Sequence, residues 1–193
     1  MEPFSIETLN SIAAARGIEY SPLDDPDPLT VRSRLAKAFP ISQQSMFESF
    51  ADPVAHVAMF PIIVASTPAI RSGLEGVLPE NVFFAFEHVQ ESSLPARVML
   101  VRYTLEAPRR IVKEAVTNPF EMAGGPLQDR KRGLVAMNFD AIGENETLLT
   151  TESTFQAESG SVFARGFIDR VWFNFFERMM FANGQIDETD FLT

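Results

Sequence analysis

Residues Ser161–Asn183, SVFARGFIDRVWFNFFERMMFAN, are the most strongly patterned stretch of this chain. Their apolar side chains recur at helical spacing, which predicts one long helix. Ser159 or Ser161 can cap its start, and Asn183-Gly184 can end it in the left-handed conformation. One face carries Ile168, Val171, Trp172, Phe175, Phe176 and Met179. A face this wide and aromatic needs a large cover, either a flat sheet or a curved sheet with a cavity beneath the helix.

Composition excludes several classes of protein. The 193 residues fit one main domain, and 46% hydrophobic residues with 18 Phe provide for a sizeable core. Cysteine is absent, which excludes disulfides and thiolate metal sites and favours a cytoplasmic location. The net charge of -10 argues against nucleic-acid binding and against anionic lipid surfaces. We expect no stable membrane insertion and no secretory signal, because no apolar run is long enough and the start lacks a basic flank.

The first 38 residues are expected to form a helical extension of a main domain that covers residues 39–193. Residues 5–17 have the pattern of a short amphipathic helix that ends at Gly17. Residues 19–30 are rich in Pro and Asp, so we expect a linker or surface strap. A second short helix is predicted over residues 30–38.

The main domain is predicted to begin with a strand at Ile41–Phe50. A short helix then opens at Asp52-Pro53 and ends at Pro61. Beyond this helix the apolar pattern changes to alternation, which indicates strands joined mostly by short turns and therefore antiparallel. The predicted strands are 82–91, 97–106, 109–117, 131–142 and 146–157. A sheet covered by one long apolar helix is a two-layer α+β domain.

This order of elements resembles the helix-grip fold of the START and SRPBCC superfamily, which includes the major birch pollen allergen and the bacterial polyketide cyclases. The resemblance lies within residues 40–182, in SQQSMFESF leading into ADPVAHVAMFP, the hairpins, and FARGFIDRVWFNFFERMM. Phe60-Pro61 stands where family members end a short helix with an aromatic-Pro pair. The first 38 residues have no counterpart in the minimal fold. Gly124-Gly125-Pro126 lies later than the family's glycine-rich loop, so that loop's role is not transferred.

The resemblance implies a curved antiparallel sheet that grips the C-terminal helix, with an apolar cavity between the two. Family members bind lipids, polyketides, plant hormones and other apolar molecules, and some catalyse cyclisation or hydrolysis. Strand alternation and this implied cavity together predict a set of ligand-binding residues. They are Phe84, Phe86, His88, Met99, Tyr103, Met137, Phe139, Trp172 and Phe176.

His88 and Tyr103 would add polar groups to this apolar set. His88 shares its expected face with Phe84 and Phe86, so it would orient a ligand or act as a general base, unless it is a structural histidine. The Tyr103 hydroxyl would hold a ligand carbonyl, or reach the rim of the core. His56 is expected at the surface or as a hydrogen-bonded boundary residue. With two distant histidines and no cysteine, we predict neither a metal nor a cofactor.

Three hypotheses about function remain open. The first is a binding module for a small apolar or amphipathic ligand, either a lipid, a polyketide or an aromatic molecule. The second is an enzyme of the cyclase or hydrolase type in the same cavity, with His88 or Tyr103 handling protons. The third is a regulatory protein that binds a partner through Phe163, Phe167 and Phe181, which lie outside the main helical stripe. No catalytic motif is present, and a homodimer is compatible with the sequence.

The connection Asn118–Arg130 is longer than a hairpin requires. It contains Gly124-Gly125-Pro126 and three apolar residues that need cover, Phe120, Met122 and Leu127. We therefore expect this loop to fold over one end of the cavity as a gate.

Overall fold

The structure is a computed structural model that describes residues 4–60, 62–68, 79–91, 94–116, 133–156 and 161–191. Side chains of residues 91, 94–97 and 161–164 are outside that description. In chain order the elements are α1 (Ile6–Arg16), β1 (Glu19–Leu23), β2 (Thr30–Phe39), α2 (Gln43–Ala51), α3 (His56–Met59), β3 (Ile63–Pro68), β4 (Val82–Glu91), β5 (Leu94–Glu106), β6 (Arg110–Val116), β7 (Leu134–Gly143), β8 (Glu146–Gln156), α4 (Ser161–Ala182) and the 3-10 helix η2 (Glu188–Asp190).

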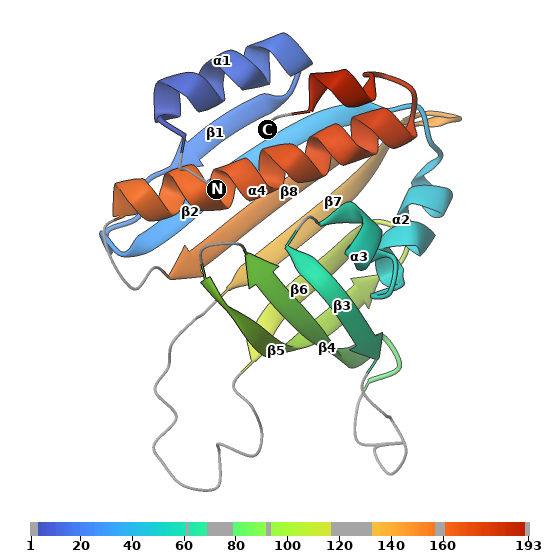
Figure 1. Ribbon diagram of the computed structural model, residues 1–193. Helices are drawn as coiled ribbons and strands as arrows, with labels where there is room; N and C mark the ends of the chain where they lie inside the picture. Colours follow the sequence, from blue (N-terminus) through green and yellow to red (C-terminus); the bar gives the residue numbers. More distant parts are fainter. Residues whose placement is uncertain are drawn as a thin grey trace, which may run out of the picture.

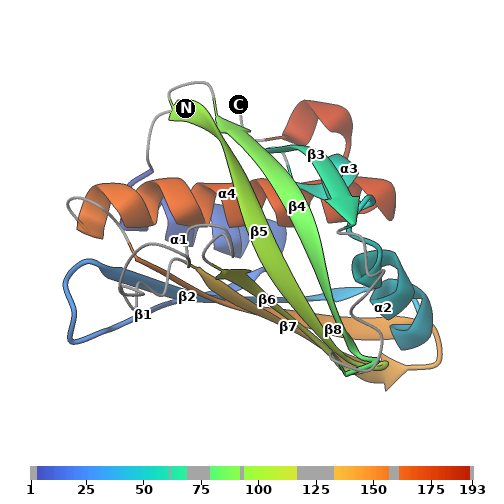
Figure 2. The same cartoon turned by 90° about the horizontal axis from the view of Figure 1, so that it is seen from below.

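The described strands form one antiparallel sheet in the order β1-β2-β8-β7-β6-β5-β4-β3. From β3 to β8, strands that follow one another in the chain are neighbours in the sheet. Figure 1 shows α4 lying across the sheet, with α1 beside it. Figure 2 shows that β4 and β5 cross at a steep angle to β2 and β8, so that the sheet is curved and α4 lies on its concave side. The predicted curved antiparallel sheet and gripped C-terminal helix are confirmed.

Residues 30–38 are a strand, and the helix predicted there is wrong. They belong to β2, which pairs with β1 on one side and with β8 on the other. Val31, Ser33 and Leu35 are buried at a spacing of two, which is the period of a strand. Strong local helix formers in Arg-Leu-Ala-Lys-Ala suggested a helix, but pairing on both edges outweighs weak local propensity. Of the described residues 4–38, only those of α1 are helical, and β1 occupies part of the predicted linker.

The strand predicted at Ile41–Phe50 is also wrong, because most of that segment forms α2. The Ser42 side chain caps α2 by accepting a hydrogen bond from the Ser45 amide at 3.3 Å. Met46, Phe47 and Phe50 are buried, and their spacing puts them on one helical face. The short helix predicted from Pro53 onward is confined to α3, His56–Met59.

The core lies between the concave face of the sheet and the helices α2, α3 and α4. Phe173, Phe175 and Phe176 of α4 are fully buried. The ring of Phe175 stacks on Phe60 with centroids 4.5 Å apart, and Phe50 of α2 meets it edge-on at 5.7 Å. None of the helices in the described ranges has the length and hydropathy needed to span a bilayer.

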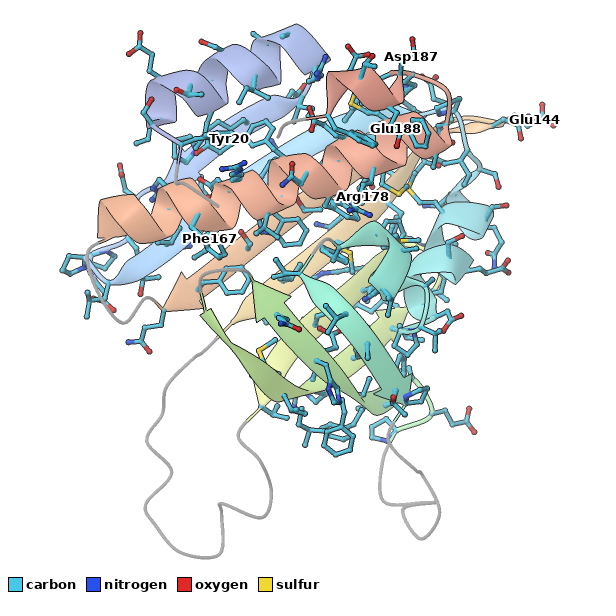
Figure 3. The ribbon with its side chains drawn as sticks, in the orientation of Figure 1. Tyr20, Glu144, Phe167, Arg178, Asp187 and Glu188 are labelled. Carbon is cyan, nitrogen blue, oxygen red and sulfur yellow. The ribbon has the colours of Figure 1, made fainter. Side chains whose placement is uncertain are left out.

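Polar contacts also hold α4 on the sheet. The buried carboxylate of Asp169 accepts hydrogen bonds from the hydroxyls of Tyr20 and Ser33, each at 2.5 Å. Near the other end of α4, buried Glu177 pairs with Arg16 of α1 at 3.1 Å. Tyr20 lies on the side of α4 away from β3, β4 and β5 (Figure 3). These contacts fix the helix in position while its opposite side faces the cavity described next.

Candidate functional site

A cavity of about 290 Å³ lies between the concave face of the sheet and α4. This volume is near the lower limit for small-molecule pockets, which range from ~300 to ~1,000 Å³. The sheet contributes Val89, Met99, Val101, Ala115, Val135 and Phe155 to the wall. The helix α4 contributes Phe167, Ile168, Val171 and Trp172, and the corner between α3 and β3 contributes Phe60, Ile62 and Ile63. The wall is therefore almost entirely apolar and partly aromatic.

Two charged residues, Glu87 and Lys113, interrupt this apolar wall. Glu87 follows buried Ala85 at a spacing of two on β4, and Lys113 follows buried Ile111 in the same way on β6, so strand alternation turns both inward. The two residues are only 3% and 8% exposed. Lys113 Nζ lies 2.8 Å from Glu87 Oε1, which makes a buried ion pair. Buried charges require such pairing because desolvation is costly.

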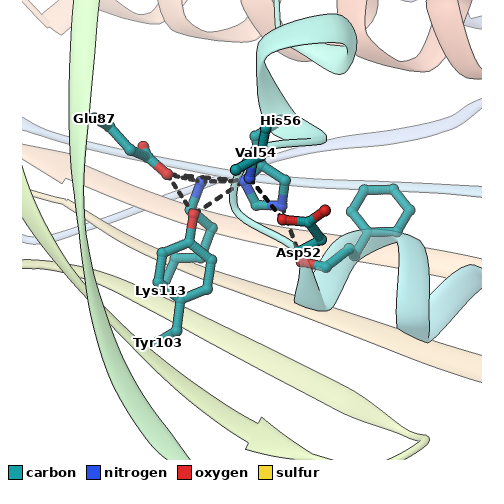
Figure 4. A network of polar contacts seen from close by, with 7 residues as sticks. Asp52, Val54, His56, Glu87, Tyr103 and Lys113 are labelled. Carbon is teal, nitrogen blue, oxygen red and sulfur yellow. Dashed lines mark hydrogen bonds and ion pairs between the residues drawn. The ribbon is translucent and has the colours of Figure 1, made fainter. Parts of the chain in front are cut away.

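His56 and Tyr103 join this ion pair in one buried network (Figure 4). His56 Nε2 lies 2.9 Å from the carbonyl oxygen of Phe50, so Nε2 carries the proton and donates it. The other ring nitrogen, Nδ1, is then free to accept a hydrogen bond from Lys113 Nζ at 3.0 Å. The Tyr103 hydroxyl donates to Glu87 Oε1 and lies 3.0 Å from His56 Nδ1. The network thus joins α3 to three neighbouring strands, β4, β5 and β6.

The network stabilises the charged form of Glu87. Burial alone would raise the pKa of this carboxyl, but the charge of Lys113 and hydrogen bonds from Lys113 and Tyr103 outweigh burial and lower the pKa to about 2. Burial and the Glu87 carboxylate raise the pKa of the Tyr103 hydroxyl, which therefore stays protonated. At neutral pH the network holds a carboxylate beside a hydroxyl donor.

Burial acts in the opposite direction on the two basic groups. It lowers the pKa of His56, and the neighbouring charge of Lys113 lowers it further, so the imidazole is neutral. Burial also lowers the pKa of Lys113, while the Glu87 carboxylate opposes that shift. Lys113 Nζ lies 5.1 Å from the ring centre of Phe60 and 5.2 Å from that of Tyr103, where aromatic faces favour its cationic form.

No protein-family model and no curated protein sequence matches the chain. Solved structures do match. A STAR-related lipid transfer protein fragment from Xanthomonas axonopodis is 13% identical, with a TM-score of 0.64 over 88% of this chain and 94% of the other. Human STARD10 is 9% identical, with a TM-score of 0.64 over 96% and 82% of the two chains. The ZhuI aromatase/cyclase from Streptomyces sp. R1128 is 10% identical, with a TM-score of 0.55 over 84% and 99%.

The chain has the START-type helix-grip fold. The resemblance inferred from the sequence is therefore confirmed at the level of the fold. Identities of 9% to 13% carry no residue roles, so the site of this helix-grip protein has to be argued from its own side chains.

Three of the predicted ligand residues do not line the helix-grip cavity. Phe86 and His88 are exposed, so the prediction that His88 points to the interior is wrong. Phe84 is half-buried and absent from the cavity wall. The inward positions of β4 are Ala85, Glu87 and Val89, one residue out of phase with the prediction. Both faces of β4 carry large apolar residues, and alternation alone cannot tell which one is concave.

The other six predicted residues lie on the inner side. Met99 and Trp172 line the cavity. Tyr103 is buried beside it and contacts Glu87, which does line it. Met137, Phe139 and Phe176 are fully buried in the core. Two of these six residues therefore line the cavity, and the other four are buried beside it or in the core.

Sequence reasoning missed the polar centre of the site. Glu87 lies between Phe86 and His88, which were predicted to face the cavity, and Lys113 was not among the predicted residues. His56 was expected at the surface or a boundary, but its side chain is completely buried. A usable signal existed, because Lys113 is two residues from Ile111 and two from Ala115 in an otherwise inward series. A charged residue in such a series needs a partner, and that partner is 26 positions away in the chain.

Two other expectations concern residues that the structure describes only in part or not at all. The loop Asn118–Arg130, predicted to act as a gate, lies outside them. Of the three residues that motivated a partner surface, Phe167 lines the cavity, Phe181 is exposed and contacts the Phe191 ring at 5.3 Å, and the Phe163 side chain is not described. Within the described ranges, no group of three or more His, Cys, Asp or Glu residues is placed to hold a metal ion.

Proposed function

We propose that this protein binds a small apolar or amphipathic molecule, such as a lipid, a polyketide or an aromatic compound, in the cavity beneath α4. The observation that carries the proposal is the cavity itself, with its apolar wall and a single buried ion pair. Such a cavity can remove an apolar body from water, while one or two polar groups set its orientation. The lack of cysteine supports a cytoplasmic location for this role.

The first experiment asks whether the cavity takes up an apolar molecule. Trp172 is the only tryptophan of the chain and lines the cavity, so energy transfer from it reports on a dye bound there. The neutral dye N-phenyl-1-naphthylamine should quench Trp172 emission in a saturable way. Native mass spectrometry of the protein from its own host then identifies a co-purifying molecule that displaces the dye.

A matched pair of variants places the binding in this cavity. Val89→Phe on β4 fills part of the wall and should weaken dye binding. Val98→Phe makes the same change on β5, at a residue that is 61% exposed, and should leave binding unchanged. Equal effects of the two substitutions, or dye binding without energy transfer from Trp172, would show that the dye binds elsewhere.

A second candidate is an enzyme of the cyclase or hydrolase type that uses the same cavity. The buried network favours it, because it combines a carboxylate, a neutral imidazole whose Nδ1 can accept a proton, and a hydroxyl donor within hydrogen-bonding distance. The similar ZhuI structure bears the name aromatase/cyclase. Turnover of the co-purifying molecule that is lost in Tyr103→Phe, with dye binding kept, would favour the enzyme over a pure binding module.

A further inference from the structure

We propose that Lys113 captures an apolar aldehyde or ketone in this cavity by forming an imine with its carbonyl carbon. This inference rests on the proposed ligand-binding function and names the chemical class of ligand. It follows from the position of one amine. Lys113 Nζ lies at the wall of an apolar cavity, 2.8 Å from a carboxylate oxygen of Glu87 and 3.0 Å from His56 Nδ1. Lysines that form imines need such desolvated surroundings and a nearby base.

The neighbouring imidazole can release the amine for attack. An ammonium group has no lone pair, so a proton must first leave Lys113. His56 Nε2 donates to the Phe50 carbonyl, which leaves the Nδ1 lone pair available for that proton. The groups that face Lys113 are Glu87 from β4, Tyr103 from β5 and His56 from α3. Burial lowers the pKa of Lys113, which assists this transfer, while Glu87 opposes it.

The reaction balances without an oxidant or reductant. The neutral amine forms a bond to the carbonyl carbon, and the carbonyl oxygen takes the proton held by His56, which gives a carbinolamine. His56 then removes a proton from the nitrogen and returns it to the hydroxyl group. Water leaves as the nitrogen lone pair forms the C=N bond. In sum, the Lys113 ammonium and a carbonyl compound give a protonated imine and one water molecule.

The Glu87 carboxylate can pair with the protonated imine as well as with the Lys113 ammonium group. The protonated imine carries the same single positive charge as the ammonium, so the ion pair with Glu87 persists through the reaction. The rings of Phe60 and Tyr103, whose centres lie 5.1 and 5.2 Å from Nζ, favour a cation in either state. The apolar wall also limits the access of water, which would hydrolyse the imine.

The composition of the chain makes this proposal easy to test. The sequence has three lysines, Lys37, Lys113 and Lys131. Lys37 lies away from the cavity, where its ammonium donates to the carbonyl of Arg16 at 2.8 Å. A Lys37→Arg and Lys131→Arg double variant keeps the positive charges and leaves Lys113 as the sole lysine. In this protein any adduct on a lysine side chain must be on Lys113.

The experiment treats the full chain and the double variant with 2-naphthaldehyde and sodium cyanoborohydride, which reduces an imine to a stable amine. Peptide mass spectrometry locates the adduct. We expect it on Lys113 in both proteins, with suppression by 2-methylnaphthalene, which has the same rings without a carbonyl. Lys113→Arg should lose the adduct, because its side chain has no primary amine. Circular dichroism verifies its fold, and Lys113→Met serves as a second variant without the amine.

The outcomes separate this inference from the proposed function. If 2-methylnaphthalene displaces the dye but no adduct forms on Lys113, the imine is overturned and the binding cavity stands. Labelling of Lys37, Lys131 or the N-terminus alone, or labelling of Lys113 that 2-methylnaphthalene does not suppress, also overturns it. If neither naphthalene compound displaces the dye and no adduct forms, the imine fails together with the aromatic ligand class.

Discussion

Trp172 combines two roles at the scale of a single residue, because it lines the cavity and also packs in the core. Its indole is 4% exposed and meets Phe60 and Phe175 edge-on, with centroids 5.6 Å apart in each pair. Trp172→Ala should lower the free energy of unfolding by about 3–5 kcal/mol, since a buried aromatic ring is lost. Urea denaturation followed by circular dichroism measures this loss.

The control for that substitution lies on the same helix. Phe181 is 47% exposed and makes one ring contact, with Phe191. Phe181→Ala should cost only about 1 kcal/mol, as expected for an exposed site with one aromatic pair. Similar losses for the two variants would mean that the indole contributes no special packing.

The ionisation of Glu87 makes the free energy of unfolding depend on pH in the acid range. Its pKa is about 2 in the folded protein, below the ordinary value of 4.5. A depressed carboxyl pKa contributes stability above the ordinary pKa, and this contribution is lost as pH falls from about 4.5 to about 2. Glu87→Gln should reduce the pH dependence of unfolding in this window. At pH 7 it should cost about 3 kcal/mol, because Lys113 loses its buried partner.

Glu114→Gln is the matched control on the sheet. Glu114 lies one residue beyond Lys113 and pairs with Arg102, both partners being more than a third exposed. Exposed ion pairs contribute little, so this change should cost less than about 1 kcal/mol. Unfolding curves at pH 7, 4 and 3 compare the two variants. A Glu87→Gln protein with the acid sensitivity of the wild type would contradict a paired, ionised Glu87.

At the scale of elements, α4 depends on a polar clamp as well as on its aromatic face. The buried Asp169 carboxylate accepts one hydrogen bond from the Tyr20 hydroxyl of β1 and one from the Ser33 hydroxyl of β2. Tyr20→Phe removes the first donor and leaves a buried carboxylate oxygen without that partner. The free energy of unfolding should fall by about 1–3 kcal/mol, and α4 amides should exchange faster. Ser21→Ala, at an exposed neighbour on β1, should change neither.

At the scale of the whole molecule, the boundary predicted at residue 39 can be tested by truncation. β2 pairs along its whole length with β8, from Thr30↔Gln156 to Phe39↔Thr147. Removing residues 1–38 would expose that edge of β8 and the core beneath it, so we expect no cooperative thermal transition. Removing residues 1–17 takes α1 alone and should lower the midpoint but keep the transition. A cooperative fragment 39–193 would instead support a separate domain.

The sequence by itself determined the elements whose pattern is unambiguous. The helical period of α4 and the alternation in β4 to β8 predicted an antiparallel sheet covered by one long helix, because burial of one face imposes a period on any sequence that forms it. That the sheet grips the helix was implied by the family resemblance. The aromatic residues of α4 also identified Trp172 as a buried anchor and a wall residue. Local patterns gave the wrong prediction at Thr30–Phe39 and Ile41–Phe50. These short segments fit the helical period and the strand period about equally weakly, and contacts with neighbouring elements decide which structure forms.

Only the tertiary structure decided which face of β4 is concave and which polar groups meet. Phe84 and Phe86 fit an inward face as well as Ala85 and Val89 do, and curvature of the whole sheet chose the second set. The ion pair of Glu87 with Lys113 joins β4 to β6 across the intervening β5. Such a contact has no local pattern, because it depends on strand order and register rather than on the spacing of residues along the chain.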